Sequence, residues 1–458
     1  MRFTDFGSRM VLAAFDGGEI TSDAGVLLLR ERAHQIRLFN RMAACFTDHR
    51  DQKRVKHHLP TLLCQRVCGM ALGYEDINDH DTLRNDPAIK LLASSCHTSK
   101  DKTPSKDKTP APLAGKSTLN RLEHSREAGN SRYHQMVPNL KKLSNLFTDI
   151  FLDSHDTPPK KITLDIDATD IKAHGHQENS FFHGYYEERC FLPLYIFCGH
   201  HLLLAQLRPS NIDGARGSRN VIRRIIKMIR NRWPKVKILV RGDSGFVREN
   251  LIKWCENNSV DYVFGLARNN NLLQKAQKVR GKAAKGMIDT NEVTRAYGDF
   301  YHRTKSESWA WPRRVIVKAE HRPGKRPQCR FLVTSLSRKT VSPKELYEDI
   351  YCPRGDMENR IKDCQLDLFG DRMSSHDYRA NQLRLIMAGF AYVLIDSIRR
   401  EALQNTPLAK AVPNTIRLKL LKVGARVINS VRRVKISMPN AYPYKDLFFK
   451  VHATLVPT

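Results

Sequence analysis

The spacing of apolar and polar residues changes several times along the chain. Up to about residue 95, and again at 117–152, apolar residues recur every three or four positions, which predicts helices. From 161 onward they alternate with polar residues or form short runs, which predicts strands. Helical spacing returns late, with the apolar run 385–395 inside a predicted helix at 377–403. This run is about half the length of a membrane span, so we expect a buried helix.

The strand-rich region has an informative order of elements. We predict strands at 161–167, 191–198, 201–207, 236–242 and 262–267, and helices at about 219–230 and 247–257. The order strand, strand, strand, helix, strand, helix, strand is that of a ribonuclease-H-like fold. A second β pattern at 293–338 predicts an insertion. The predicted fold class is therefore α/β (α+β): a ribonuclease-H-like core with a β-strand insertion, preceded by a mainly helical region.

These patterns divide the chain into five parts. A mainly helical region spans 1–155. The core follows in two parts, at 156–270 and 341–404, with the β-rich insertion at 271–340 between them. A basic C-terminal region spans 405–458. Within the first part, residues 97–112 repeat Asp-Lys-Thr-Pro and lack apolar residues to bury. We predict a disordered insert there, and a functional basic linker is the other interpretation.

Charge indicates the class of partner. Lys and Arg number 77 against 47 acidic residues, for a formal net charge of +30 spread along the chain. Such an excess favours a polyanionic partner, so we predict nucleic acid. A basic protein of a membrane surface is the rival, but no long amphipathic basic helix with aromatic anchors is present. No signal peptide is recognisable either. We expect a cytoplasmic protein without a membrane partner.

Cysteine and histidine raise the question of a zinc site. The ten cysteines form no Cys-x-x-Cys pair, although Cys64 and Cys68 are one helical turn apart. A second set of candidate zinc ligands is Cys190, Cys198, His200 and His201. We favour free thiols in a reducing cytoplasm, because free cysteine is commonly buried as a small apolar residue.

Three acidic residues stand out by position. Asp167 closes the strand at 161–167, Asp243 follows the strand at 236–242, and Glu358 lies in a late charged helix. Carboxylates are the ligands that Mg²⁺ (or Mn²⁺) prefers, and two such ions per active site can hold both sides of a phosphoryl displacement. Asp165 shares the strand face of Asp167 and is a further candidate ligand. Each aspartate would also suit a turn or a helix cap, and in that case its role would be structural rather than catalytic.

The helix that carries Glu358 has further candidates. Ser342 and Glu345 form a plausible capping box at its start. Tyr351, Arg354 and Glu358 are spaced to share one helix face. Pro353 predicts a kink after Tyr351.

The spacing Tyr-x-x-Arg-x-x-x-Glu, behind a β insertion and two strand-end aspartates, resembles the DDE transposases of bacterial insertion sequences. Six blocks narrow the resemblance to the insertion sequence 1380 family. They are Asp16-Gly-Gly-Glu-Ile-Thr-Ser-Asp-Ala-Gly, Gly73-Tyr-Glu-Asp-Ile-Asn-Asp-His-Asp, His174-Gly-His-Gln-Glu, Leu207-Arg-Pro-Ser-Asn, Arg241-Gly-Asp-Ser-Gly-Phe and Arg354-Gly-Asp-Met-Glu-Asn-Arg-Ile-Lys.

This resemblance implies an endonuclease that cuts the terminal inverted repeats of a mobile genetic element and joins them to target DNA. It implies catalytic roles for Asp167, Asp243 and Glu358, and DNA contacts for Tyr351 and Arg354. It also implies DNA binding by the helical region 1–155, and we expect a homodimer or higher oligomer on DNA in the bacterial nucleoid. The family's lysine seven residues after the glutamate is Gln365 here, and Lys362 is the candidate substitute.

The insertion contains two tryptophans beside two arginines. Trp309 and Trp311 are two apart in a predicted strand and face the same way, with Arg313 and Arg314 after them. We predict that one indole stacks on a displaced base at the transposon end while the arginines hold adjacent phosphate. The alternative is that one or both indoles pack into the core of the insertion.

Two other functions remain open from the sequence. A ribonuclease-H-like nuclease, such as a resolvase, would cut DNA without joining it. An inactive, domesticated DNA-binding protein would retain the fold alone.

Overall fold

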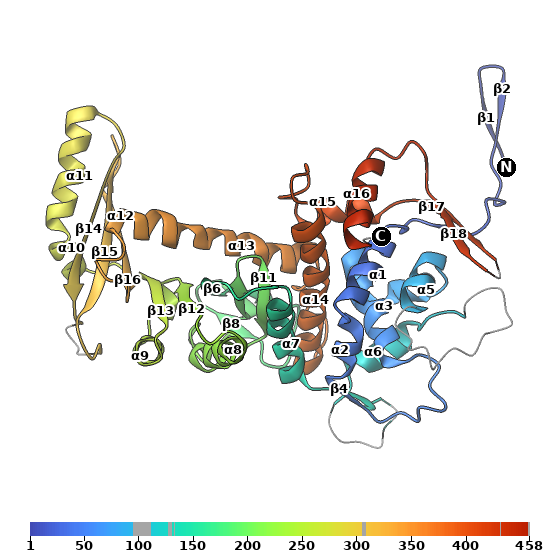
Figure 1. Cartoon of the computed structure of the whole chain (residues 1–458), viewed down its shortest axis with the longest axis horizontal. Coiled ribbons are helices and arrows are strands. Elements are labelled where there is room, and N and C mark those ends of the chain that lie inside the picture. Colours follow the sequence, from blue (N-terminus) through green and yellow to red (C-terminus); the bar gives the residue numbers. More distant parts are fainter. Residues whose placement is uncertain (95–110, 127–130, 132, 305–307, 431, 457–458) are drawn as a thin grey trace. The chain divides into compact units, whose positions relative to one another are not determined.

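The computed structural model describes residues 1–94, 111–126, 131, 133–304, 308–430 and 432–456. The chain forms two compact units (Figure 1). Unit 1 combines Met1–Leu146 with Asp363–Thr458, and unit 2 is Phe147–Lys362. The division falls within helix α7 (Leu140–Asp153). No described helix has both the length and the apolar character needed to cross a membrane.

Unit 2 is built on a mixed sheet of eight strands in the order β11-β10-β6-β12-β13-β16-β15-β14. Strand β6 is parallel to β12, and β12 is parallel to β13, whereas every other neighbouring pair is antiparallel. The strands are β6 (Lys161–Ala168), β10 (Leu194–Cys198), β11 (His201–Gln206), β12 (Lys237–Gly242), β13 (Asp261–Leu266), β14 (Thr294–His302), β15 (Arg313–His321) and β16 (Gln328–Thr334).

The first five of these strands and the two helices among them follow the predicted order along the chain. A tight turn joins β10 to β11, where Gly199 adopts a left-handed φ of 58° that glycine accepts without strain. A small three-stranded sheet lies between β6 and β10 in sequence and is formed by β7 (Ile171–Lys172), β8 (Phe181–His183) and β9 (Glu188–Phe191).

Two amphipathic helices, α8 (Ser218–Arg232) and α9 (Glu249–Asn257), cover one face of the sheet. Their buried residues share one core with every second residue of β6, namely Ile162, Leu164 and Ile166. Side chains on a strand alternate between its two faces. Asp165 and Asp167 therefore lie on the opposite face of the sheet from α8.

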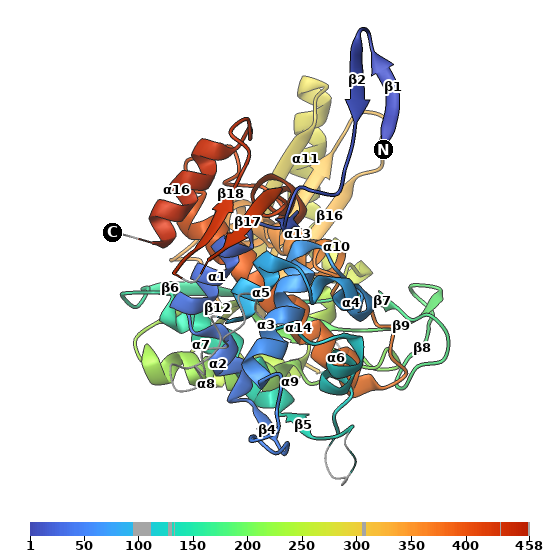
Figure 2. The same ribbon diagram turned by 90° about the vertical axis from the view of Figure 1, so that its right-hand side faces the viewer.

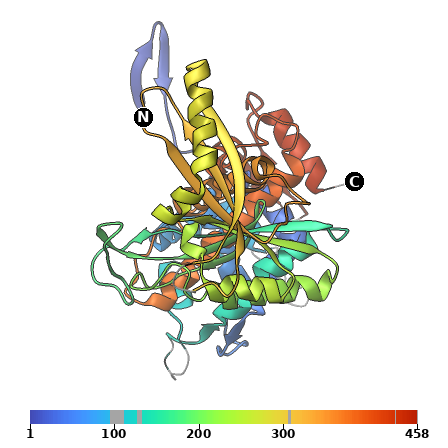
Figure 3. The same cartoon turned by 90° about the vertical axis from the view of Figure 1, so that its left-hand side faces the viewer.

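The insertion is mixed rather than purely β-rich. Helices α10 (Asn270–Lys275) and α11 (Gln277–Thr290) come first, and strands β14–β16 follow. These strands continue the sheet beyond β13 instead of forming a separate one. Helix α11 packs along β14 and β15, as Figure 3 shows (yellow helix beside the yellow strand).

The segment before Glu358 is a succession of short helical turns. The predicted capping box is present, with Ser342 and Glu345 each binding the other's backbone, and it starts α12 (Pro343–Glu345). A π-helical segment η4 (Leu346–Tyr351), a 3₁₀ turn η5 (Cys352–Arg354) and α13 (Gly355–Lys362) follow. The change of helix type at Pro353 agrees with the predicted disruption, because proline cannot donate a backbone hydrogen bond.

Unit 1 is organised around α14 (Tyr378–Ala402), the helix predicted at 377–403, which is buried along almost its whole length. Helices α1, α3, α6 and α16 pack against it (Figure 2). The remaining helices surround these. The described α-helices of this unit other than α14 are α1 (Val26–Gln35), α2 (Leu38–Ala43), α3 (Leu59–Leu72), α4 (His80–Leu83), α5 (Pro87–Ser94), α6 (Lys116–Glu123), α15 (Pro413–Ile416) and α16 (Lys445–Leu455).

A buried ion network joins three helices of unit 1. Glu123 on α6 accepts from Arg66 Nε on α3 at 2.7 Å and from Arg384 Nε on α14 at 2.6 Å. Burial alone would raise the pKa of the Glu123 carboxyl, but the two guanidinium groups outweigh it and lower that pKa. The carboxylate is thus ionised and paired on both oxygens.

The ends of unit 1 differ in part from the sequence prediction. An exposed hairpin of β1 (Arg2–Phe6) and β2 (Arg9–Leu12) begins the region predicted to be mainly helical. The basic C-terminal region contains strands β17 (Ala425–Asn429) and β18 (Val434–Ser437), which form a small sheet with β3 (Ile20–Thr21). Strands β4 (Phe46–Asp48) and β5 (Met136–Pro138) form a second small pair. The predicted disordered insert, except for residues 111 and 112, lies outside the described residues.

Candidate active site

The two strand-end aspartates come from neighbouring parallel strands. Gly242 on β12 pairs in register with Ile166 on β6, so Asp243 and Asp167 are the next residues along the two strands. Parallel strands end at the same edge of a sheet. The topology therefore places both carboxylates at one edge of the sheet.

Close packing fixes the turn that carries Asp243. Its Oδ1 accepts from the backbone N–H of Gly245 at 2.9 Å, which caps the 3₁₀ turn η3 (Ser244–Phe246). On β13, a Cβ at Gly265 would lie 2.8 Å from the hydroxyl of Tyr351 and 3.1 Å from the backbone nitrogen of Ser244. Only glycine leaves room for this approach, so Gly265 brings Tyr351 against the Asp243 turn.

Arg354 joins two of the three candidate carboxylates. Its Nη1 lies 3.2 Å from Oδ2 of Asp167, and its Nη2 lies 3.0 Å from Oε1 of Glu358. Glu358 follows Arg354 by one helical turn, and its side chain is half exposed. The helix and the strand end are thus connected through a single guanidinium group.

The electrostatics of Asp167 bring in the third carboxylate. Burial raises the pKa of the Asp167 carboxyl to about 6; the Arg354 guanidinium opposes this rise, and the carboxylates of Asp243 and Glu358 add to it. Asp167 therefore senses the charge of all three of these residues. Burial also raises the pKa of Tyr351, with Arg354 acting against the rise and Asp243 with it.

Asp165 has a different environment from Asp167. It lies directly opposite Arg241 on β12, which donates to it from Nε at 2.5 Å and from Nη2 at 2.8 Å. The same guanidinium also donates to the backbone oxygen of Ile350, next to Tyr351. The geometry thus gives Asp165 a positioning contact between sheet and helix, with both of its carboxylate oxygens engaged by Arg241.

The remaining helical candidate is Lys362, the last residue of α13. It is exposed and follows Glu358 by four residues, which is about one helical turn. This position is compatible with contact to a bound polyanion.

The two tryptophans of the insertion both lie against the guanidinium of Arg313, with each ring centroid 5.3 Å from its Cζ, but they differ in burial. Trp309 is 4% exposed and belongs to the core of the sheet, in agreement with the core-packing alternative, whereas Trp311 is 40% exposed. Arg313 and Arg314 are each 3% exposed. Arg313 binds Glu249 and Glu256, and Arg314 binds Asp299. Their burial and carboxylate partners do not support the prediction that these two arginines hold DNA phosphate.

The donor set suits a hard divalent cation, because the three candidate residues all offer carboxylate oxygens. Among the residues that the structure describes, no three His, Cys, Asp or Glu side chains converge closely enough to form a metal-binding group. Instead, the cation that contacts both Asp167 and Glu358 is the guanidinium of Arg354. The four cysteines considered as zinc ligands are all buried, namely Cys64, Cys68, Cys190 and Cys198.

Sequence reasoning missed two residues that shape this site. Arg241 belongs to the Arg-Gly-Asp block, and its place two residues before Asp243 could have indicated that it shares a sheet face with the acidic residues. Gly265 interrupts an apolar strand, and an isolated strand glycine often marks a close approach of other atoms. Neither signal identifies the partner residue.

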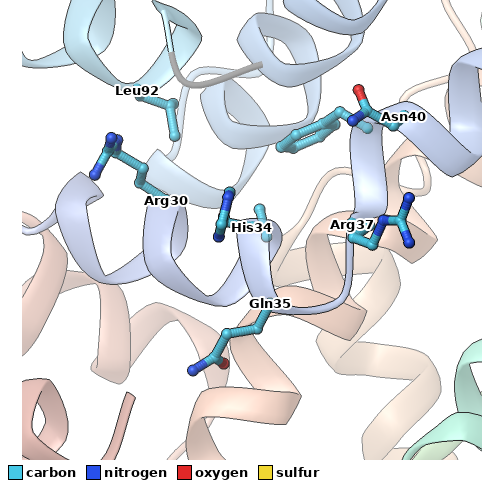
Figure 4. A pocket seen from close by; sticks show the side chains of 8 residues that line it. Arg30, His34, Gln35, Arg37, Asn40 and Leu92 are labelled. Carbon is cyan, nitrogen blue, oxygen red and sulfur yellow. The ribbon is translucent and has the colours of Figure 1, made fainter. Parts of the chain in front are cut away.

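Unit 1 contains a separate basic pocket of about 400 Å³. Arg30 and His34 line it from α1, Leu92 faces them from α5, and Arg37 and Asn40 lie at the start of α2 (Figure 4). Basic side chains stand at its rim, but Ala33, Phe39 and Leu92 make most of its lining apolar.

Comparison with known proteins identifies a family whose model matches almost the whole chain. A family model described as "Transposase DDE domain group 1" matches residues 3–458. Comparison with curated proteins gives no significant match. Among solved structures, a piggyBac transposase synaptic complex with hairpin DNA, determined by cryo-electron microscopy, matches with a TM-score of 0.40 and 11% identity, covering 88% of this chain and 80% of that one.

Proposed function

We propose that this chain, which belongs to the transposase DDE domain group 1 family, is the transposase of a bacterial insertion sequence of the 1380 type. It binds the terminal inverted repeats of its element, cleaves DNA there, and joins the freed 3′ ends to target DNA. The observation that carries the proposal is a family match over 3–458 in a chain where one guanidinium pairs with a strand-end aspartate and the helical glutamate, and a second strand-end aspartate follows the neighbouring parallel strand.

The proposed catalytic fold is ribonuclease-H-like. Strands β11-β10-β6-β12-β13 supply its sheet, and α8 and α9 supply its covering helices. Within this fold we assign the catalytic roles to Asp167, Asp243 and Glu358. The insertion β14–β16 is an extension of the same sheet.

Asp167, Asp243 and Glu358 would hold divalent cations, Mg²⁺ or Mn²⁺, two per active site. When bound, such ions supply charge for the attacking and leaving oxygens of a phosphoryl displacement. Arg354 pairs with both Asp167 and Glu358, and its remaining donor capacity suits a phosphate oxygen of the DNA. Tyr351 and Lys362 extend this contact with DNA.

The surfaces that bind DNA lie on both units in this proposal. The net charge of +30 favours a polyanion, and binding should weaken steeply as salt rises, because phosphate contacts release counterions. We assign terminal-repeat recognition to the helical region of unit 1, where the pocket at Arg30 and Arg37 offers cationic groups. We further propose action as a homodimer or higher oligomer on DNA, in the nucleoid.

A strand-transfer assay tests the function as a whole. The full chain is incubated with Mg²⁺, a labelled duplex of the terminal repeat that flanks its gene, and a supercoiled target plasmid. We expect specific nicks at the repeat end and covalent joining of that end to the plasmid. Cleavage without joining would instead favour a nuclease or resolvase, and sequence-specific binding without cleavage would favour an inactive DNA-binding protein.

A further inference from the structure

A polar cavity of about 430 Å³ lies beside the start of helix α8 in unit 2. Three arginines and three asparagines supply most of its polar lining: Arg216, Arg219, Arg248, Asn211, Asn220 and Asn250. None of these six residues belongs to the carboxylate cluster described above. Their guanidinium and amide groups are donors of the kind that bind phosphate oxygens.

The loop that forms this cavity is held in place from within. Arg208 is 5% exposed and donates to the backbone oxygens of Leu192 at 2.9 Å, Gly214 at 2.9 Å and Arg216 at 3.0 Å. One buried guanidinium thus fixes two points of the loop and anchors them to Leu192. The cavity is therefore a formed feature of the fold, presented on ordered backbone.

The cavity carries a surplus of positive charge. Asp213 accepts from the Ala215 backbone at 2.7 Å and from Arg248 at 2.5 and 3.1 Å, so this carboxylate is used by the loop and by Arg248. Arg216 and Arg219 are exposed, and neither forms an ion pair with another described residue. Two guanidinium groups are consequently available to an anion from solution.

The cavity adjoins the proposed active site next to both of its strand ends. A Cβ on Gly214 would lie 3.9 Å from that of Ala168, the residue after Asp167. Arg248 follows the 3₁₀ turn that Asp243 caps, and the Asp213–Arg248 ion pair ties that turn to the loop. An anion bound by Arg216 and Arg219 would thus lie close to the proposed active site, with the loop that contains Gly214 between the two.

We propose that this cavity binds a backbone phosphate of the DNA strand that passes through the active site, on the side of the cleaved bond where the Arg216 loop lies. The inference rests on the proposed transposase function and adds a substrate contact to it. Arginine suits this role because its planar fork can donate two parallel hydrogen bonds to one phosphate. The asparagine amides add uncharged donors at the rim.

The test compares two double variants of the full chain that lose equal charge. Arg216→Ala/Arg219→Ala empties the cavity of its free cations, while Lys235→Ala/Lys237→Ala removes two exposed lysines near the start of β12. These lysines lie at the opposite end of the strand from Asp243, about 20 Å away at roughly 3.3 Å per residue. Binding of a labelled terminal-repeat duplex is measured by anisotropy at several salt concentrations, together with the cleavage rate at saturating DNA.

We expect the Arg216/Arg219 variant to bind at least tenfold more weakly at about 0.1 M salt, with a log–log salt slope smaller in magnitude by about 1, since the one lost phosphate contact removes about 0.9. Its cleavage rate at saturating DNA should change less than its affinity. The lysine variant should match the wild type in both. Equal affinity and slope for wild type and the arginine variant would overturn the proposal.

Two further arms keep the outcomes distinct. Arg216→Lys/Arg219→Lys keeps the charge but loses the planar guanidinium, so its affinity for the duplex should fall between those of the wild type and the alanine variant. If thermal unfolding shows that the alanine variant does not fold, the lysine substitutions take its place in the test. Strong thermal stabilisation by inorganic phosphate, with DNA binding independent of both arginines, would identify a small-anion site and overturn the proposal. If the wild type neither binds nor cleaves the repeat, the proposed function fails first; if it does both and the arginine variant binds equally well, only this inference fails.

Discussion

The guanidinium of Arg354 lies 3.2 Å from the carboxylate of Asp167, a residue 187 positions earlier in the chain. The contact links a helix to the end of a strand through a cation that arginine carries at any physiological pH. It also holds Glu358, one turn later, at 3.0 Å. Without it, the carboxylates of Asp167 and Glu358 would lose the cation that they share.

The first prediction concerns Arg354 itself. Arg354→Lys keeps the charge but cannot hold two carboxylates with one planar fork, so we expect cleavage to fall at least tenfold. Arg354→Ala should fall further. Duplex cleavage with Mg²⁺ measures both, and Lys344→Ala, an exposed lysine of the same segment, is the control. Full activity of the lysine variant would show that charge alone suffices there.

The second prediction concerns the three carboxylates. Asp167→Asn, Asp243→Asn and Glu358→Gln should each reduce cleavage by about a hundredfold or more, in line with the loss of one electrostatic group in a catalytic site. Binding of the duplex should persist, because these residues are acidic and contribute no attraction for phosphate. Gel-shift and cleavage assays are run in parallel, with the exposed Asp356→Asn as the matched control. Appreciable cleavage by any of the three variants contradicts its assignment.

The third prediction follows from the pKa of Asp167, which burial raises from 3.8 to about 6. At pH values between about 4 and 6, the folded protein binds more protons than the unfolded chain. The free energy of unfolding that this group contributes therefore falls as the pH rises through this range, and it remains at its lower value above about pH 6. Asp167→Asn lacks this loss. We expect it to be more stable than wild type above pH 6, by up to about 3 kcal/mol, and to lose that advantage below pH 4.

Urea unfolding of both proteins from pH 4 to pH 8, without divalent cations, measures this difference. Asp356→Asn, which changes an exposed carboxylate, should show no such trend. A difference between wild type and Asp167→Asn that stays constant with pH would show that the carboxyl has its ordinary pKa in the folded protein.

The fourth prediction concerns the buried network at Glu123. Glu123→Ala leaves Arg66 and Arg384 buried without their shared carboxylate, so the free energy of unfolding should fall by about 3–5 kcal/mol. Glu75→Ala in the same unit removes an exposed partner of Arg372 and should cost less than about 1 kcal/mol. Chemical denaturation distinguishes the two. Similar small losses would mean that the network adds little to stability.

The fifth prediction separates the two tryptophans. Trp309→Ala removes a core side chain and should cost about 3–5 kcal/mol of stability. Trp311→Ala removes a partly exposed ring that lies against Arg313 and should cost less, about 1 kcal/mol. If this indole stacks on a displaced base, the variant should impair processing of intact duplex ends while sparing ends that are already unpaired. Equal processing of both substrates by wild type and Trp311→Ala would exclude the stacking role.

Local sequence determined several elements of the fold, including the strands that lead to the candidate site. The strands that end at Asp167 and Asp243, the capping box at Ser342, and helix α14 were all predictable, because alternation, capping and helical spacing depend on residues close together in the chain. That these two strands pair in parallel, which brings Asp167 and Asp243 to one edge of the sheet, was decided by the tertiary structure.

Tertiary structure decided the partners. A sequence shows that Arg354, Arg241 and Arg313 are cations, but not that the first bridges Asp167 and Glu358, the second engages Asp165, or the third is buried between Glu249 and Glu256. It likewise did not show that strands β14–β16 extend the main sheet, or that residues 363–458 join 1–146 in one unit. Each of these depends on contacts between residues far apart in the chain, and such contacts are selected by the packing of the whole fold rather than by neighbouring residues.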